Sequence, residues 1–267
     1  MSILTISRQF GSGGREIGRA VSRELGYNYI DRTKILEDIR QAGEKWENWS
    51  ETLDEHRPSV WEKYDWSFKG FAALIQSVVL QEALKDNVVI MGRGGNFLLR
   101  DIPFALRVRI NAPIEERIAR IVTRESVDIK TARWLAEKTD SERAFFIHAI
   151  YGKRWDDTAE YDMTIDTADS PFEEISSMLA RTLKKKDDLK SDDAVELLRL
   201  RTLAAKVKAV IATDASFFIP VFDVVAEEST IVIRGIVHSP AEHKRIEDAA
   251  QKSAGNVPVR CELHYRR

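Results

Sequence analysis

The stretch RQFGSGGREIG, residues 8–18, has the composition of a loop that binds phosphate. It follows the apolar run 3–6 and precedes a segment with helical spacing, so backbone N–H groups of its glycine-rich turn could converge on phosphate oxygens at the positive end of a helix. The sequence therefore predicts an anion site formed by Gly11, Ser12, Gly13 and Gly14, with Arg8, Arg15 and Glu16 beside them.

The stretch departs from the standard phosphate-loop pattern G-x-x-x-x-G-K-[ST] at two positions. When Gly13 is aligned with the second glycine, Arg8 takes the place of the first glycine and Gly14 that of the lysine. Arg15 and Arg8 are the available replacements for the lysine, because a guanidinium can pair with two phosphate oxygens. A dinucleotide fingerprint, supported by Asp31 but lacking its third glycine, stays open, as does a structural turn or a site for another anion.

Two carboxylates are the candidate ligands of Mg²⁺ near this loop, Glu16 and Asp31. A carboxylate in the first turn of a helix is stabilised by the helix dipole, and this capping role is the favoured interpretation for Glu16. Beside phosphates the same carboxylate would repel them unless a metal ion lay between the two. Magnesium binding is therefore the alternative to capping.

The elements that must position these residues alternate along the first two thirds of the chain. Apolar, β-branched runs of strand length are separated by longer segments with helical spacing, which is typical of a parallel sheet with helical crossovers. The predicted strands are 3–6, 27–30, 88–91, 106–110 and 161–165. A long, mostly helical insert at residues 41–85 interrupts the alternation. It holds Trp46, Trp49, Trp61 and Trp66, for which a core role is favoured over a ligand-facing wall.

The polar, charged stretch 182–194 is predicted to be the end of a helix followed by a linker, and a domain boundary falls there. The segments predicted after it are a helix at 197–211, strands at 221–225 and 230–237, a helix at 240–253 and a strand at 257–264. This αββαβ unit is long enough to fold alone.

Composition excludes several functions. Lys and Arg number 41 against 43 Asp and Glu, so no overall basic field indicates nucleic acid as a partner. Cys261 is the single cysteine, which rules out an internal disulfide and a cysteine-based zinc cluster, and the five histidines lack metal-ligand spacing. We see no signal segment and no run of about 18 apolar residues, so the expected location is cytoplasmic.

Three separated segments resemble the cytidylate kinase-like family, a divergent branch of the P-loop nucleoside monophosphate kinases. They are ITISRQFGSGGREIGRAVSRELGYNYIDR, VVIMGRGGNFLL and TDSERAFFIHAIYGKRWDDTAEYDMTIDT. The resemblance covers roughly residues 1–183 and implies a kinase domain at 1–185 with a three-layer α/β core around a parallel sheet. It also implies that the insert binds the acceptor and that an arginine-bearing lid lies at about residues 125–157.

The same resemblance assigns roles to the charged residues. It implies that residues 11–15 cradle the phosphates of ATP, with Mg²⁺ bridging them. The candidates for catalysis are Arg15, Arg93, Arg143 and Asp140, and those for acceptor binding are Asp31, Arg32, Arg93 and Arg154. Both carboxylates of the family's DGRD stretch are replaced here, by Met91 and Gly94, so the acceptor is not fixed as CMP.

Residues 194–267 resemble a BON domain, a small module linked with membranes, phospholipids or envelope partners. The resemblance lies in the strand and turn at 232–239 and in Gly255 before the last strand. The expected function is an ATP-dependent phosphotransferase acting on a nucleotide or related small acceptor, with a C-terminal unit that senses or tethers. The alternatives are a catalytically silent nucleotide sensor acting through that unit, and a tether that carries a vestigial kinase core.

Overall fold

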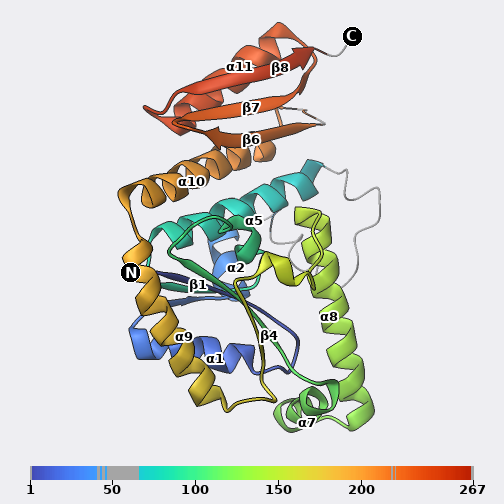
Figure 1. The fold of residues 1–267 in the computed structure, drawn as a ribbon. Coiled ribbons are helices and arrows are strands. Elements are labelled where there is room, and N and C mark those ends of the chain that lie inside the picture. Colours follow the sequence, from blue (N-terminus) through green and yellow to red (C-terminus); the bar gives the residue numbers. More distant parts are fainter. Residues whose placement is uncertain are drawn as a thin grey trace.

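The first two thirds of the chain form a five-stranded parallel sheet with helices on both faces (Figure 1). The computed structural model describes residues 2–40, 43, 46, 66–217, 219 and 221–265. The strands are β1 (Ile3–Arg8), β2 (Asn28–Ile30), β3 (Val88–Met91), β4 (Ala105–Asn111) and β5 (Met163–Asp166). They are hydrogen-bonded in the order β2-β3-β1-β4-β5, so β1 lies at the centre of the sheet.

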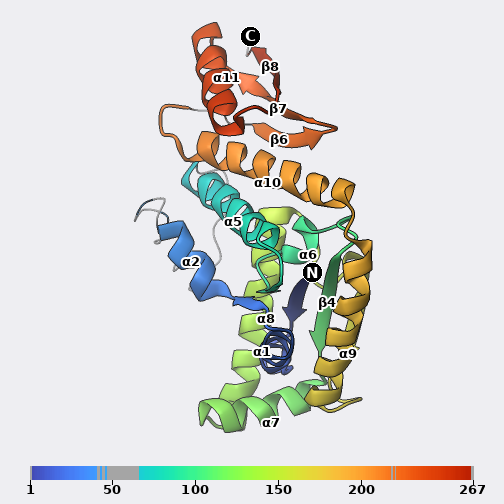
Figure 2. The ribbon, with the colours of Figure 1, turned by 90° about the vertical axis from the view of Figure 1, so that its left-hand side faces the viewer.

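The sheet and the helices on its two faces form three layers. They are α1 (Gly14–Leu25), α2 (Arg32–Arg40), α5 (Trp66–Leu84), α6 (Gly95–Leu98), α7 (Ile114–Glu125), α8 (Ile129–Tyr151) and α9 (Phe172–Lys186), with 3-10 turns η1 (Thr158–Glu160) and η2 (Asp187–Leu189). Figure 2 shows α2 and α5 on one side of the sheet and α9 on the other. Side chains alternate along β1: Leu4 and Ile6 pack in the cluster of α1 and α9, and Ile3 in that of α2 and α5. This confirms the predicted three-layer α/β architecture.

Part of the tryptophan-rich insert belongs to the core. Trp46 is fully buried, and its ring lies 5.8 Å from that of Trp66. A Cβ on Gly70 would lie 2.5 Å from the Trp46 ring, so the glycine in α5 makes room for the indole. Trp46 therefore has the favoured core role, whereas Trp49 and Trp61 lie outside the described residues.

The C-terminal unit consists of α10 (Asp192–Thr213), β6 (Phe222–Glu227), β7 (Thr230–Val237), α11 (Pro240–Ala254) and β8 (Val259–Tyr265). β7 pairs antiparallel with β6 and parallel with β8. Helix α10 lies between this small sheet and α5 in both views (Figures 1 and 2). Leu198 and Ala205 of α10 are buried in the same apolar cluster as α5, which joins the predicted αββαβ unit to the first sheet's layers.

The stretch 182–194 is more regular than the predicted linker. Helix α9 continues to Lys186, the turn η2 follows, and α10 begins at Asp192, where Ser191 Oγ accepts the N–H of Ala194. Lysines in the last turn of one helix and aspartates in the first turn of the next complement the helix dipoles, so the charged residues form helix ends here. Within the described residues, no helix is long and apolar enough to span a membrane.

Candidate functional site

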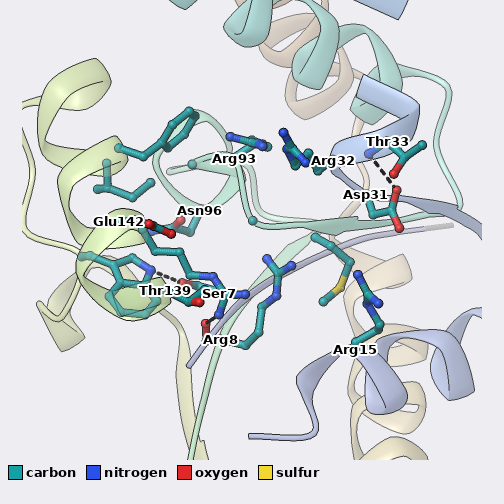
Figure 3. Close-up of a pocket in the computed structure, with 17 residues that line it drawn as sticks. Ser7, Arg8, Arg15, Asp31, Arg32, Thr33, Arg93, Asn96, Thr139 and Glu142 are labelled. Atoms are coloured by element: carbon teal, nitrogen blue, oxygen red, sulfur yellow. Dashed lines mark hydrogen bonds between the residues drawn. The ribbon is translucent and has the colours of Figure 1, made fainter. Parts of the chain in front are cut away.

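Two adjoining cavities lie at the edge of the sheet where β1, β2 and β3 end, and Figure 3 shows the residues that line the larger one. The smaller, the loop cavity, measures about 210 Å³ and is formed mainly by residues 8–16. The larger, the basic cavity, measures about 330 Å³ and is lined by residues from the ends of these strands and from α8. Arg8, Arg15 and Arg143 line both cavities, so ligands in the two cavities would share these cations.

The glycines of the loop adopt conformations that other residues would disturb. Gly11 and Gly13 have positive φ angles of 79° and 82°. A Cβ on Gly13 would lie 2.1 Å from the ring of Phe172. Gly13 caps α1 without a side-chain hydrogen bond to the first turn, which leaves N–H groups at the positive end of the helix for an anion. The loop therefore has the geometry of an anion site.

Hydrogen bonds within the turn and to neighbouring segments hold the loop in place. Ser12 is buried, and its hydroxyl donates to the carbonyl oxygen of Gln9 at 2.9 Å. Thr167 Oγ1 donates to the Ser12 carbonyl oxygen at 3.0 Å, and the N–H of Ala112 donates to the Gln9 side chain at 3.1 Å. The N–H of Ser12 also donates to the Gln9 carbonyl oxygen, at 3.3 Å, so the hydroxyl and both backbone groups of Ser12 hold the turn in place.

Arg8 and Arg15 bring two positive charges to the boundary between the cavities. Burial lowers the pKa of Arg8, and the neighbouring charge of Arg15 acts in the same direction. The side chain of Arg15 is exposed. Within the part of the chain that the structure describes, neither guanidinium makes a hydrogen bond or an ion pair with the protein. Both charges are therefore available to a ligand.

Arg93 lies in a tight turn directly after β3. Its φ angle is 54°, and its neighbours Gly92 and Gly94 also have positive φ. Positive φ strains a residue that has a Cβ, and such strain persists where the surroundings impose it. Here the Tyr151 hydroxyl donates to the Arg93 carbonyl oxygen at 2.6 Å, and a Cβ on Gly94 would lie 2.1 Å from the Tyr151 ring. Helix α8 therefore fixes this turn.

The guanidinium of Arg93 lies at the basic cavity among an aromatic ring and other cations. Its carbon is 4.7 Å from the centroid of the Phe146 ring. Burial, together with the charges of Arg32 and Arg8, lowers the pKa of Arg93 to about 9. In Figure 3, Arg32 and Arg93 lie close together on one side of the cavity, while Arg8 and Arg15 reach toward it from the other. A bound anion would relieve the repulsion among these groups.

Helix α8 contributes Arg143 to both cavities, whereas Asp140 of the same helix lies outside them. Nη1 of Arg143 donates to the Arg8 carbonyl oxygen at 2.7 Å, and burial lowers the pKa of Arg143 well below its usual value. Asp140 lines neither cavity. Its carboxylate accepts the N–H of Phe10 at 2.8 Å and pairs with Arg117 at 2.6 Å. The family resemblance implies catalysis for Asp140, whereas the structure places its carboxylate against the loop backbone and Arg117, outside both cavities.

The predicted magnesium ligands line different cavities. Glu16 lies at the loop cavity, 4.0 Å from Arg124, and Asp31 lies at the basic cavity, where it accepts the N–H of Thr33 at 3.1 Å. Among the described residues, no three His, Cys, Asp or Glu side chains gather to hold a metal ion. A single carboxylate beside a phosphate loop fits a Mg²⁺ that arrives with a nucleotide, because this ion keeps several waters and binds mainly through substrate phosphates.

Arg154 lines neither cavity, whereas the next residue, Trp155, lines the basic cavity. The Arg154 side chain is 77% exposed and pairs with Asp156 at 3.1 Å. Trp155 is buried and lines the basic cavity, and its Nε1 donates to the Ser7 hydroxyl at 2.8 Å. The guanidinium of Arg109 lies 4.4 Å from the Trp155 ring centroid on the far side of this network. The structure therefore brings Trp155 to the cavity and leaves the predicted acceptor contact, Arg154, outside it.

The basic cavity combines excess positive charge with some apolar surface. Its charged residues are Arg8, Arg15, Arg32, Arg93 and Arg143 against Asp31 and Glu142. Such a set favours a polyanion, and guanidinium groups bind phosphate oxygens in pairs. Sequence reasoning missed Thr139, Phe146 and Ile147, which also line the cavity. They lie three or four residues from Arg143 along α8, so helical spacing was the signal that could have found them.

Comparisons with known proteins find relatives of the first two thirds of the chain. The model of the cytidylate kinase-like family matches residues 3–169. A cytidylate kinase of Thermoplasma acidophilum is 27% identical over 183 residues, which cover 67% of this chain and 91% of the relative. One of Thermococcus kodakarensis is 25% identical over 168 residues, covering 62% of this chain and 79% of the relative.

A solved structure of an uncharacterized protein from Eubacterium ventriosum superposes with a TM-score of 0.55 at 20% identity, covering 69% of this chain and 99% of that one. This likeness concerns the fold alone. The family match ends at residue 169, so the resemblance of residues 194–267 to a BON domain stays a prediction.

Proposed function

The chain belongs to the cytidylate kinase-like family, and we propose that it is an ATP-dependent phosphotransferase that phosphorylates a nucleotide, CMP or a similar compound, or a related small acceptor. The observation that carries this proposal is the pair of adjoining cavities with three shared arginines, Arg8, Arg15 and Arg143. Transfer between two phosphate-bearing compounds needs two anion sites in contact, with positive charge at the boundary where charge develops.

The donor would occupy the loop cavity. Residues 11–15 lie at the positive end of α1, where the backbone N–H groups of Gly13, Gly14 and Arg15 would bind the phosphates of ATP. Mg²⁺ arriving with ATP would neutralise phosphate charge, with Glu16 as the carboxylate nearest to the loop. Arg124 lines the same cavity and adds a further cation.

The acceptor would occupy the basic cavity, with an anionic group toward Arg32 and Arg93. Phe146 and Trp155 would contact its apolar part, and Asn96 would offer a hydrogen-bonding side chain. An acceptor oxygen then forms a bond to the γ-phosphorus of ATP while the bond to the β–γ bridging oxygen breaks, and ADP leaves. A phosphomonoester has its second pKa near 6, so its attacking oxygen carries no proton at neutral pH and no protein base is required.

Transfer of ³²P from ATP to a panel of nucleotides, nucleosides and small metabolites tests this proposal. We expect transfer to at least one anionic acceptor, and a strong loss in Arg93→Met, whereas Arg199→Met, on the exposed face of α10, should match the wild type. Calorimetric binding of ATP without transfer to any compound would favour the silent sensor. The absence of both binding and transfer would refute the phosphotransferase.

For the C-terminal unit, we propose the sensing or tethering role that its resemblance to a BON domain implies. The packing of α10 against α5 supports such coupling, because α5 leads directly into β3 and the Arg93 turn. Cosedimentation of the full chain with vesicles of anionic phospholipid tests the lipid partner. We expect binding that a variant lacking residues 221–267 loses, and equal sedimentation with and without vesicles would remove this partner.

A further inference from the structure

Compared with the standard phosphate-loop pattern, a cationic residue and a glycine have exchanged positions in the glycine-rich loop. In the pattern G-x-x-x-x-G-K, with Gly13 as the second glycine, the first glycine falls on residue 8 and the lysine on residue 14. This chain has Arg8 and Gly14 at those positions. Taken singly, each departure is a loss: the first removes a flexible residue and the second removes a charge.

The two positions share one space in the structure. A Cβ on Gly14 would lie 2.7 Å from the Cβ of Arg8 and 3.0 Å from its Cγ. Side-chain carbons do not approach this closely in a packed protein, so an arginine at residue 8 and a lysine at residue 14 exclude each other unless the backbone moves. Glycine at residue 14 is therefore the condition for arginine at residue 8.

The side chain of Arg8 extends from the loop to the turn after β3. A Cβ on Gly92 would lie 2.5 Å from Nη1 of Arg8, so the absent side chain at Gly92 leaves room for the guanidinium. At this point Arg8 lines both cavities. Its guanidinium has no hydrogen bond or ion pair with any described residue. Arg8 is half-buried, and a cation that is partly withdrawn from water without a partner is unfavourable; an anionic ligand would supply the partner.

We infer that Arg8 takes over the function of the absent loop lysine, binding the outer phosphates of the donor at the boundary with the acceptor, and that residue 14 is glycine to admit it. This inference rests on the proposed phosphotransferase function. Arg15, the other candidate replacement, is exposed on the first turn of α1, where solvent and salt screen its charge. Arg15 therefore contributes less than Arg8.

Binding of MgATP and of inorganic tripolyphosphate, measured by calorimetry beside thermal unfolding, tests the inference. Arg8→Met keeps most of the side-chain stem and removes the charge, so affinity should fall about tenfold or more, and further than in the matched Arg15→Met. The melting temperature of Arg8→Met should stay or rise, because an unpaired, half-buried charge is removed. An arginine with a structural role alone would give a lower melting temperature and unchanged affinity.

The exchanged pair Arg8→Gly with Gly14→Lys restores the standard pattern. Gly14→Lys alone should lower the melting temperature through its overlap with Arg8, and the double variant should recover it and bind tripolyphosphate better than Arg8→Gly alone. Unchanged affinity in Arg8→Met, or no gain in a folded double variant, would overturn the inference. A wild type that binds neither probe would remove the proposed function as well, whereas a wild type that binds beside an unaffected Arg8→Met would remove only the inference.

Discussion

Replacing Asp140 by asparagine should separate a positioning role from a catalytic one. Oδ2 of Asp140 pairs with Arg117 at 2.6 Å, and Oδ1 accepts the N–H of Phe10 at 2.8 Å. The two charged side chains are only 16% and 9% exposed. Asparagine keeps one acceptor, yet it removes the negative charge that offsets the buried guanidinium. We therefore expect a large loss of stability from a change of almost constant shape.

The structure sets the size of this loss. Breaking a buried ion pair by removing one partner costs about 3–5 kcal/mol, and the oxygen that asparagine retains lowers the expected value to about 3 kcal/mol. Arg117 would keep one hydrogen bond from its Nη1, to the Phe10 carbonyl oxygen at 3.2 Å. For a chain of this size a loss of about 3 kcal/mol corresponds to a fall in melting temperature of about 6–12 °C.

Thermal unfolding followed by circular dichroism measures this fall, and the same two helices offer a matched control. Glu115 of α7 pairs with Arg133 of α8 at 2.7 Å, with side chains 72% and 42% exposed. Glu115→Gln should cost less than about 1 kcal/mol, because solvent screens an exposed pair. If Asp140→Asn melts no lower than Glu115→Gln but abolishes phosphoryl transfer, the positioning role is wrong and the catalytic prediction from sequence is right.

Three further outcomes are expected. Affinity for CMP, the proposed acceptor, should fall about tenfold between pH 8 and pH 10. A bound anion raises the pKa of Arg93 above its ligand-free value of about 9, so the contribution of the charged guanidinium to binding is fully present below pH 9 and is lost as the pH rises above it. Calorimetry should show a flat pH profile for Arg93→Gln. Gly13→Ala should lower the melting temperature, with about 2–3 kcal/mol lost to positive φ and to overlap with Phe172, and Phe172→Ala should restore part of it. A chain ending at residue 190 should lose its cooperative unfolding transition in calorimetric scans because α5 becomes uncovered, whereas one ending at residue 213 should keep it.

Much of the fold could be predicted because the spacing of apolar residues and the length of each apolar run can be recognised in short stretches of sequence. Strands β3 and β7 have the predicted bounds, 88–91 and 230–237. β1 continues two residues beyond the predicted end, because Ser7 and Arg8 pair with Arg109 and Ile110 of β4. Polar residues that extend a strand through hydrogen bonds to another strand give no local sequence signal. The start of α10 could not be predicted either, because its first turn is charged and resembles a linker in sequence.

The site could be predicted in part, for a topological reason. β1, β2 and β3 are adjacent and parallel, so the residues at and just after their carboxyl ends meet at one edge of the sheet, and Arg8, Asp31 and Arg93 gather there. The residues after α8 follow no such rule. Gly152 ends the helix in a left-handed conformation, and beyond it the helical period no longer says which side chain faces the cavity. Trp155 could not be distinguished from its neighbour by sequence for this reason.

The altered loop shows why departures from a motif must be judged in pairs. Residues 8 and 14 are six positions apart, and the chain alone gives no reason to connect them. The sheet and the start of α1 bring the Arg8 side chain into the space that a residue 14 side chain would need. If Arg8→Met loses affinity for tripolyphosphate while the fold is retained, one exchange explains both departures, and the missing lysine is no evidence for a silent kinase.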